Sequence, residues 1–347
     1  MIEDSRSVDP SSAGQPGAGG VNGGKGSGRC SLPGRTGLYL YLLPIVVLPL
    51  LLIASAFLVI PSRWFALHSG NTYVANLGYG ATLFDRDCQV LIYGDSSAMV
   101  GLDPAVIRQQ TGLTTCNIAE FEGMTLIGHT SLVDTFLEHN PRPRFVVFLY
   151  TPEDLSIPND WSSANVGTFE AVTFQLQHAR NAQTMLELAL HPGVTLGWAE
   201  LGLRMALQHV GSQPVSFATA HLRESNDGQL PIMGGGLAKC DSIPHNRLPD
   251  AAWISNLRRR YGVDGMRVIV DATPTVACDP SLGFFQQHLK GLIDDTPYLP
   301  IPIALYSNDG RLHANEQGSR ALSTMVADQI LGQFNPPAAA ARGIGGR

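Results

Sequence analysis

Two short segments of this 347-residue chain carry side chains that could act together in acyl transfer. Ser96 follows Gly94-Asp95 directly after an apolar run, and Asp309 and His313 lie near the other end of the chain. A serine hydroxyl becomes a good nucleophile when a histidine takes its proton, and a carboxylate can orient that histidine. Each segment alone is a common turn, because Gly, Asp and Ser favour turns. Together they predict Ser96 as nucleophile, His313 as base and Asp309 as orienting carboxylate, if the fold brings them together.

The surrounding pattern is typical of a parallel α/β sheet. We predict strands at residues 90–93, 114–118, 145–150, 266–272 and 301–306, and helices at 103–110, 124–139, 251–261 and 315–331. Strands that alternate with helices imply right-handed crossovers, so the expected fold is a three-layer α/β/α domain with a mostly parallel, five-stranded sheet. Ser96 and His313 each follow a predicted strand, at the sheet edge where such folds bind ligands. Asp271, which ends the fourth strand, is a candidate for lining the same pocket.

The rest of the chain divides by composition. We interpret residues 64–335 as one α/β domain with an insertion at about 155–250, and a small separate subdomain is the alternative for the insertion. Residues 1–36 are rich in Gly, Ser and Pro, and bury too little apolar surface to offset the entropy of ordering. We therefore predict a disordered segment there and, on the same grounds, a flexible tail at 336–347.

Residues 38–60 contain no charged side chain. At about 1.5 Å per residue, a helix of that length crosses the hydrocarbon core of a bilayer, and we predict a single transmembrane helix. A cleaved signal peptide with a site at 54–56 is the alternative, although the apolar stretch exceeds the usual core of about 7–15 residues. Basic residues gather before the span, whereas only Arg63 follows it closely. This bias predicts a cytoplasmic N-terminus and a main domain in the periplasm or outside the cell.

Four cysteines lie on the predicted outer side, where disulfides form: Cys88, Cys116, Cys240 and Cys278. Adjacent parallel strands would bring the first two within bonding distance, so we predict Cys88–Cys116 and Cys240–Cys278, with four free thiols as the alternative. The spacing contains no Cys-x-x-Cys or His-x-x-x-His pair, and we expect no metal or other cofactor. The formal net charge of −6 lacks the basic character that nucleic-acid binding needs, so no nucleic-acid partner is expected.

These motifs resemble those of the SGNH, or GDSL-type, hydrolase and acyltransferase superfamily, over roughly residues 88–150 and 264–333. Gly94-Asp95-Ser96 matches the block whose serine is the nucleophile. Asn117 to Gly123 is similar to the second block, whose glycine amide helps to form an oxyanion hole. The resemblance therefore implies that the amides of Ser96 and Gly123 hold the oxyanion. Asp309 and His313 are similar to the last block of the family.

Two positions depart from the family pattern. The last block usually reads Asp-x-x-His, and here one more residue separates Asp309 from His313, so a Ser96–His313 dyad is the alternative to a triad. The third block usually supplies an Asn that donates to the oxyanion, and here that place reads Thr-Pro-Glu-Asp at 151–154. Loss of one donor costs on the order of 10²–10³ in rate, unless a residue of the insertion replaces it.

The resemblance implies a membrane-anchored, extracytoplasmic serine esterase or O-acyltransferase that acts on acetyl esters of cell-surface or exported polysaccharide. Its expected partners are a carbohydrate or acyl-ester substrate, the membrane through a single helix, and a membrane acyl donor protein. The alternative is a catalytically silent, carbohydrate-binding component of an envelope polysaccharide assembly. The two departures from the family pattern favour that alternative.

Overall fold

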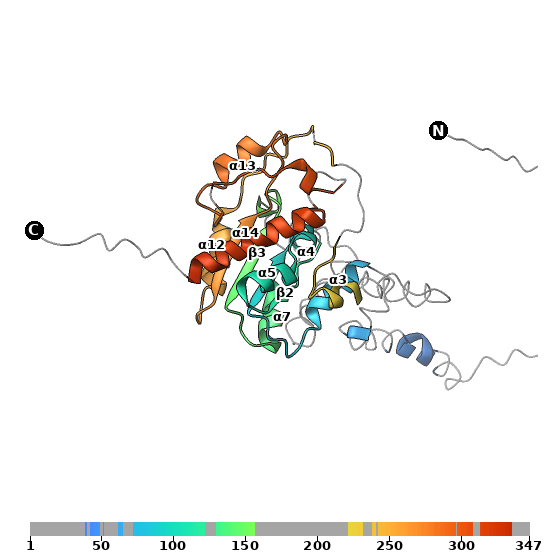
Figure 1. The fold of residues 1–347 in the computed structure, drawn as a ribbon. Coiled ribbons are helices and arrows are strands. Elements are labelled where there is room, and N and C mark those ends of the chain that lie inside the picture. Colours follow the sequence, from blue (N-terminus) through green and yellow to red (C-terminus); the bar gives the residue numbers. More distant parts are fainter. Residues whose placement is uncertain are drawn as a thin grey trace, which may run out of the picture. The chain divides into compact units, whose positions relative to one another are not determined.

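A computed structural model describes the parts of the chain on which the fold is based (Figure 1). The described residues are 39, 42–48, 51, 62–64, 72–121, 130–156, 221–231, 238–240, 242–295, 297–307 and 313–334. Contacts divide the chain into two units, Met1–Pro49 and Leu50–Arg347. In the first unit residues 42–48 are helical, and the second unit holds every element described below.

Four parallel strands form the sheet that organises the second unit (Figure 1). They are β1 (Val90–Gly94), β2 (Thr115–Asn117), β3 (Phe145–Tyr150) and β4 (Arg267–Ala272), in the spatial order β2-β1-β3-β4. In the register, Leu91 lies opposite both Cys116 and Val146. The apolar run of β3 is buried at every position, as expected of a central strand covered on both faces. The predicted α/β class and parallel sheet are confirmed.

The predicted fifth strand at 301–306 is wrong, and the sheet has four strands within the described residues. Ile301 makes one isolated parallel bridge with Val276, and Ile303–Leu305 (η2) forms a 3-10 turn. Pro300 and Pro302 flank Ile301, and proline has no N–H to donate to a ladder. The apolar pattern predicted a strand, but these prolines limit its parallel pairing to a single residue.

Helices cover both faces of the sheet. One face packs against α4 (Ser96–Gly101), α5 (Pro104–Thr111) and α14 (Glu316–Phe334), and Figure 1 shows α14 in red beside α4 and α5. The opposite face packs against α3 (Thr72–Ala81), α7 (Ser131–His139), α12 (Ala251–Tyr261) and α13 (Leu282–His288). The side chains of the strands alternate between the two hydrophobic clusters, which is the pattern that a sheet between two layers of helices requires.

Local sequence signals explain where several helices begin and end. Asp103 caps α5 by accepting from the amide of Ala105 at 2.8 Å, and Pro104 occupies the first turn. Gly112 ends α5 in the left-handed conformation, with φ of 72°. The predicted helices at 103–110, 251–261 and 315–331 therefore correspond to α5, α12 and α14. The predicted helix at 124–139 corresponds to α7 from residue 131, and its start lies outside the described residues.

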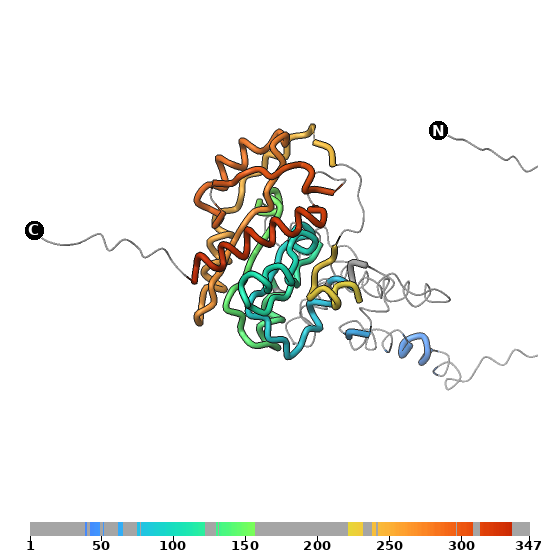
Figure 2. Tube along the Cα trace, viewed as in Figure 1, coloured from blue at the N-terminus to red at the C-terminus, as the bar shows by residue number. Residues whose placement is uncertain are grey.

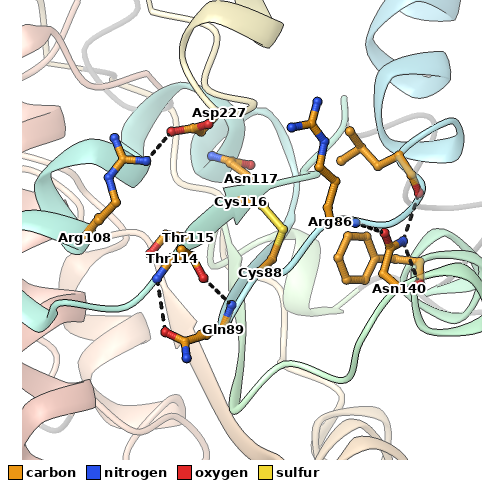
Figure 3. Close-up of a disulfide and its surroundings, with 12 residues drawn as sticks. Arg86, Cys88, Gln89, Arg108, Thr114, Thr115, Cys116, Asn117, Asn140 and Asp227 are labelled. Atoms are coloured by element: carbon orange, nitrogen blue, oxygen red, sulfur yellow. Dashed lines mark hydrogen bonds and ion pairs between the residues drawn. A yellow bond between two sulfur atoms is a disulfide. The ribbon is translucent and has the colours of Figure 1, made fainter.

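Both predicted disulfides are confirmed. Cys88 and Cys116 join the start of β1 to β2, as Figure 3 shows, with 5.6 Å between their Cα atoms. Cys240 and Cys278 join the insertion to the segment after β4, with 5.9 Å between their Cα atoms. In the first pair Cys88 is 1% exposed and Cys116 is half-buried, whereas both cysteines of the second pair are exposed.

Several predictions concern residues outside the described part of the chain. Among the described residues, no helix has both the length and the apolar character needed to span a membrane. Most of the predicted span at 38–60 is not among them, so it stays a prediction. The same holds for the segments 1–36 and 336–347 and for most of the insertion at 155–250.

Candidate active site

Ser96 lies on a tight turn between β1 and α4, at the carboxyl edge of the sheet. The turn passes so close to β3 that a Cβ atom on Gly94 would lie 1.7 Å from the carbonyl oxygen of Leu149. Only glycine fits there. Asp95 then caps α4, because its Oδ1 accepts from the amide of Ser97 at 2.8 Å. Gly94 and Asp95 are therefore required by the local geometry of the turn that presents Ser96.

The carboxylate of Asp95 joins the serine turn to the neighbouring strands. Its Oδ1 also accepts from the Ser97 hydroxyl at 2.6 Å, and its Oδ2 accepts from the Thr151 amide at 2.6 Å. The Ser97 hydroxyl in turn lies 2.5 Å from Oγ1 of Thr273, which follows β4. Asp95 and Ser97 are both fully buried. Their polar groups are used in holding together the ends of β1, β3 and β4.

Ser96 has a different environment from Ser97, although the two are adjacent. Ser96 is partly exposed, and its Oγ lies 2.9 Å from Nε2 of His313. That distance suits a hydrogen bond in which the hydroxyl donates to an unprotonated Nε2. The structure therefore brings together the sequence-predicted nucleophile and base, which are 217 residues apart. Ser97 has no access to the histidine, because its hydroxyl is engaged by Asp95 and Thr273.

His313 is held by a short antiparallel closure of its own segment. The Ser307 amide donates to the His313 carbonyl oxygen at 2.8 Å, and Tyr306 bridges Ala314 in antiparallel fashion. Asn315 adds a second anchor. Its Nδ2 donates to the Tyr306 carbonyl oxygen at 3.1 Å, and its Oδ1 accepts from the Gly318 amide at 3.0 Å. The asparagine thus fixes the chain that carries His313 to the start of α14.

Two predicted site residues lie outside the described residues. Asp309 belongs to the segment 308–312, and Gly123 belongs to the segment 122–129. The chain on both sides of 308–312 is fixed, since Ser307 and His313 are hydrogen-bonded to each other. The roles of Asp309 as an orienting carboxylate and of Gly123 as an oxyanion donor stay predictions.

The segment at 151–154 has a structural role in the serine turn. Its first amide, that of Thr151, donates to Asp95, and Asp154 begins the 3-10 turn Asp154–Ser156 (η1). Asn117, the asparagine of the second block, also has a structural role. Its Nδ2 donates to the carbonyl oxygens of Ala98 at 2.9 Å and Leu102 at 3.0 Å. Neither segment therefore supplies the side-chain amide that the family pattern places in the oxyanion hole.

Asp271 lies at the end of β4 and is buried. It lines a small pocket with Leu149, Asp295 and Gln329, and that lining includes neither Ser96 nor His313. Burial raises the pKa of Asp271 to about 7, against the opposing effect of a hydrogen bond from the Asp295 amide. The lining of this pocket does not place Asp271 beside Ser96, so the expectation that Asp271 lines the pocket of the serine stays a prediction.

Sequence reasoning missed two buried polar residues near the site, Arg223 and Gln229. Both belong to the insertion, and both bond to segments that carry predicted site residues. Asn226-Asp227-Gly228 gives a turn signal, but nothing local shows that an arginine beside it is buried. Within the described residues, no group of three or more His, Cys, Asp or Glu side chains is arranged to hold a metal ion.

The arrangement suits nucleophilic acyl chemistry. A partly exposed serine at the carboxyl edge of a parallel sheet is paired with a histidine ring nitrogen. No protein-family model, curated protein or solved structure matches the chain. A functional assignment therefore depends on these residues, their geometry and the resemblance of their motifs.

Proposed function

We propose that the chain is a serine esterase or O-acyltransferase of the SGNH type. Its substrates are acetyl esters of cell-surface or exported polysaccharide, and a single helix anchors it in the membrane with the α/β domain outside. The observation that carries this proposal is the 2.9 Å distance between Ser96 Oγ and His313 Nε2. The resemblance of the motifs supplies the substrate class and the family.

In the proposed reaction, Ser96 Oγ attacks the carbonyl carbon of the ester while His313 Nε2 takes the hydroxyl proton. The carbonyl oxygen becomes an oxyanion, which the amides of Ser96 and Gly123 stabilise. The intermediate then expels the alcohol, which receives the proton from His313, and leaves acetyl-Ser96. Water as the second nucleophile makes the protein an esterase, and a sugar hydroxyl makes it a transferase. Asp309 orients the imidazole throughout.

The disulfides support the proposed location. Disulfides persist in oxidising compartments and are rare where cellular thiols keep cysteines reduced. Cys240–Cys278 is exposed, so a reducing environment would have direct access to it. Both pairs lie C-terminal to the proposed membrane span, as expected if that part of the chain is extracytoplasmic.

A second candidate is a carbohydrate-binding component without catalytic activity. The segment 151–154 favours it, since this position has no asparagine and its first amide is already bonded to Asp95. An oxyanion hole with two donors would be weaker than one with three.

Labelling with a fluorophosphonate separates the two candidates, because the reagent reacts with an activated serine. The full chain, purified in detergent, should be labelled at a single residue, Ser96. Ser96→Ala and His313→Ala should abolish labelling, whereas the matched variant Ser97→Ala should retain it. Unlabelled protein from the same preparation is assayed in parallel for acetate release from a panel of acetylated glycans. A folded wild-type chain that neither reacts nor hydrolyses any acetyl ester would overturn the enzyme proposal and favour the binding component.

A further inference from the structure

One described segment of the insertion, residues 221–231, packs against the edge of the sheet. Residues 221–231 form a short helical stretch at 221–225 followed by a turn, and Gly228 has a φ of 103°. Figure 2 shows this gold segment beside the tube of α3. In Figure 3, Asp227 from the same turn is paired with Arg108 of α5, over the end of β2.

β2 is an edge strand, and the chain beyond it continues to pair with β1 on one side only. The amide of Ile118 donates to the Ile92 carbonyl oxygen at 2.9 Å, and the amide of Glu120 donates to the Gly94 carbonyl oxygen at 2.9 Å. The carbonyl oxygens of Asn117 and Ala119 face the other side, where the described part of the chain adds no further strand to the sheet. This stretch leads directly into residues 122–129, which hold Gly123.

Arg223 occupies that open side. Its Nη2 donates to the carbonyl oxygens of Asn117 at 3.0 Å and Ala119 at 3.1 Å. Its Nε donates to the Gly228 carbonyl oxygen at 2.7 Å, and its Nη1 donates to the Asn76 carbonyl oxygen of α3 at 2.9 Å. The guanidinium also lies 4.7 Å from the ring centre of Tyr79. Because a guanidinium is planar and rigid, these bonds fix the directions of the two carbonyl groups together.

Arg223 is fully buried, and burial lowers its pKa to about 10. A buried arginine is costly unless its donors are satisfied, and here backbone carbonyl groups satisfy them. The amide of Asn117 completes the arrangement by donating to the Asp227 carbonyl oxygen at 2.9 Å. Residues 221–231 thus take the place of a further strand along the end of β2.

Gln229 connects the same segment to the other two parts of the site. Its Nε2 donates to the Val100 carbonyl oxygen at 3.0 Å, near the end of the helix that begins with Ser96. The same nitrogen donates to Ser319 Oγ at 2.8 Å, in the helix that follows His313. The Leu230 amide donates to the Met99 carbonyl oxygen at 3.1 Å. Segment 221–231 therefore contacts all three chain segments that carry the serine, the histidine and the predicted oxyanion glycine.

We propose that residues 221–231 of the insertion are a brace that positions the active site, with Arg223 as its principal positioning residue. Arg223 sets the direction in which the chain leaves β2, and hence the place of the oxyanion donor that follows. Gln229 fixes the position of the helix that begins with Ser96 relative to the helix that follows His313. The proposal rests on the proposed acyl chemistry and assigns to the insertion a role in turnover in addition to any role in substrate binding.

The test uses the full chain in detergent and the hydrolysis of 4-nitrophenyl acetate. Arg223→Lys keeps the charge but loses the fork that reaches two carbonyl groups, so we expect the kcat to fall by about tenfold to a hundredfold, as small misplacements do. The KM should stay within about threefold, since bond-making and not ester binding is impaired. The pH profile of kcat should keep its shape, because His313 is untouched. Hydrogen exchange in peptides that cover residues 115–121 should accelerate.

Arg108→Gln is the matched control. It also removes an arginine that contacts segment 221–231, through the exposed pair with Asp227, but it leaves the carbonyl groups of Asn117 and Ala119 bonded. Its kcat and exchange should stay within about twofold of wild type, as is usual for exposed ion pairs. Gln229→Ala is a second test that leaves Arg223 in place, and we expect its kcat to fall about three- to tenfold.

The outcomes separate the brace from the proposed function. A folded Arg223→Lys chain with faster exchange at 115–121 and an unchanged kcat would show that Arg223 only covers the sheet edge, and would overturn the positioning role. If Arg223→Lys does not fold, an unchanged kcat in Gln229→Ala overturns it instead. A folded wild type with neither esterase activity nor serine labelling would overturn the proposed function, and the positioning role with it.

Discussion

The serine turn and the histidine segment reach the same site by different means. Ser96 follows a central strand, and the carboxylate beside it is buried with three hydrogen bonds to the turn and to β3. Among the described residues, His313 follows a 3-10 turn instead of a strand of the sheet, and its segment is anchored by an antiparallel bridge and by the side chain of Asn315. The nucleophile is thus positioned by the core, and the base by local bonds at its margin. Changes beside the serine should therefore reduce stability, while changes beside the histidine should mainly reduce turnover.

The largest effect should come from the two adjacent serines. Ser96→Ala should lower turnover of an acetyl ester by on the order of 10⁴-fold or more, because the nucleophile is lost. Thermal stability should barely change, since the Ser96 side chain is partly exposed. Ser97→Ala should keep turnover within about tenfold but lower the free energy of unfolding by about 1–3 kcal/mol, because it removes a buried hydroxyl bonded to Asp95 and Thr273.

Kinetics of purified variants, with denaturant unfolding of each, measure both quantities. If Ser97→Ala is the inactive variant and Ser96→Ala stays active, Ser97 is the nucleophile and the assignment of Ser96 is wrong. If both variants lose the same free energy of unfolding, the buried Ser97 hydroxyl and the partly exposed Ser96 hydroxyl contribute equally to stability, and the proposed difference between them is wrong.

The next effect concerns Asp309, one residue further from the histidine than in the family pattern. If the loop bulges at Gly310, Asp309 still reaches the imidazole, and glycine makes such a bulge accessible because it adopts positive φ. We then expect Asp309→Asn to lower turnover at least about a hundredfold through loss of the orienting carboxylate. Thermal stability should change little. Near-normal turnover in this variant would leave His313 working as a dyad with Ser96, and Asp309→Ala gives the same reading without the amide.

The two regions also differ in how far sequence could predict them. The apolar runs of β1 and β3 are covered by helices on both faces, so their pattern gave their positions to within a residue. The segment at 301–306 has a similar apolar pattern but lies at the margin, where Pro300 and Pro302 decide the outcome. Short-range patterns therefore predicted the four strands of the sheet better than the proline-flanked segment at its margin.

The long-range features divide in the same way. The apposition of Ser96 and His313 was predictable because each follows an expected strand or its remnant at one sheet edge. The role of Arg223 was not, because its partners are backbone carbonyl groups of residues 76, 117 and 119, which lie far away in the chain. Every residue has a backbone carbonyl group, so the residue types of a segment do not show which carbonyl groups accept a hydrogen bond from a distant arginine.

A smaller effect is expected at Asn315, which anchors the histidine segment. Asn315→Ala removes the acceptor for the Gly318 amide and the donor to the Tyr306 carbonyl oxygen. Loss of such a cap costs about 1 kcal/mol of unfolding free energy. Turnover should fall several-fold, because the segment of His313 then loses its side-chain anchor. Asn315→Asp restores the acceptor only, and should recover most of the stability but less of the turnover. Equal recovery of both would mean that the cap alone holds the histidine.

The smallest effect on turnover should come from Asp271, which lies in neither region and serves as a control for both. Burial raises its pKa to about 7, well above the usual 3.8 of an exposed aspartate. The folded state therefore holds the proton where the unfolded state has released it. Stability from this group is complete below about pH 4 and is lost as the pH rises through about 7. Asp271→Asn removes that loss, since a neutral amide does not ionise.

We expect Asp271→Asn to be more stable than wild type at pH 8 by about 1–3 kcal/mol, with a smaller difference at pH 5. The asparagine keeps an acceptor for the Asp295 amide, and its Nδ2 offers a donor to Gln329 Oε1, which is buried without a partner. Turnover should stay within about threefold, because the pocket of Asp271 includes neither Ser96 nor His313. Denaturant unfolding at the two pH values tests the first point. A large loss of turnover would place Asp271 in the active site and remove the distinction between that pocket and the serine turn.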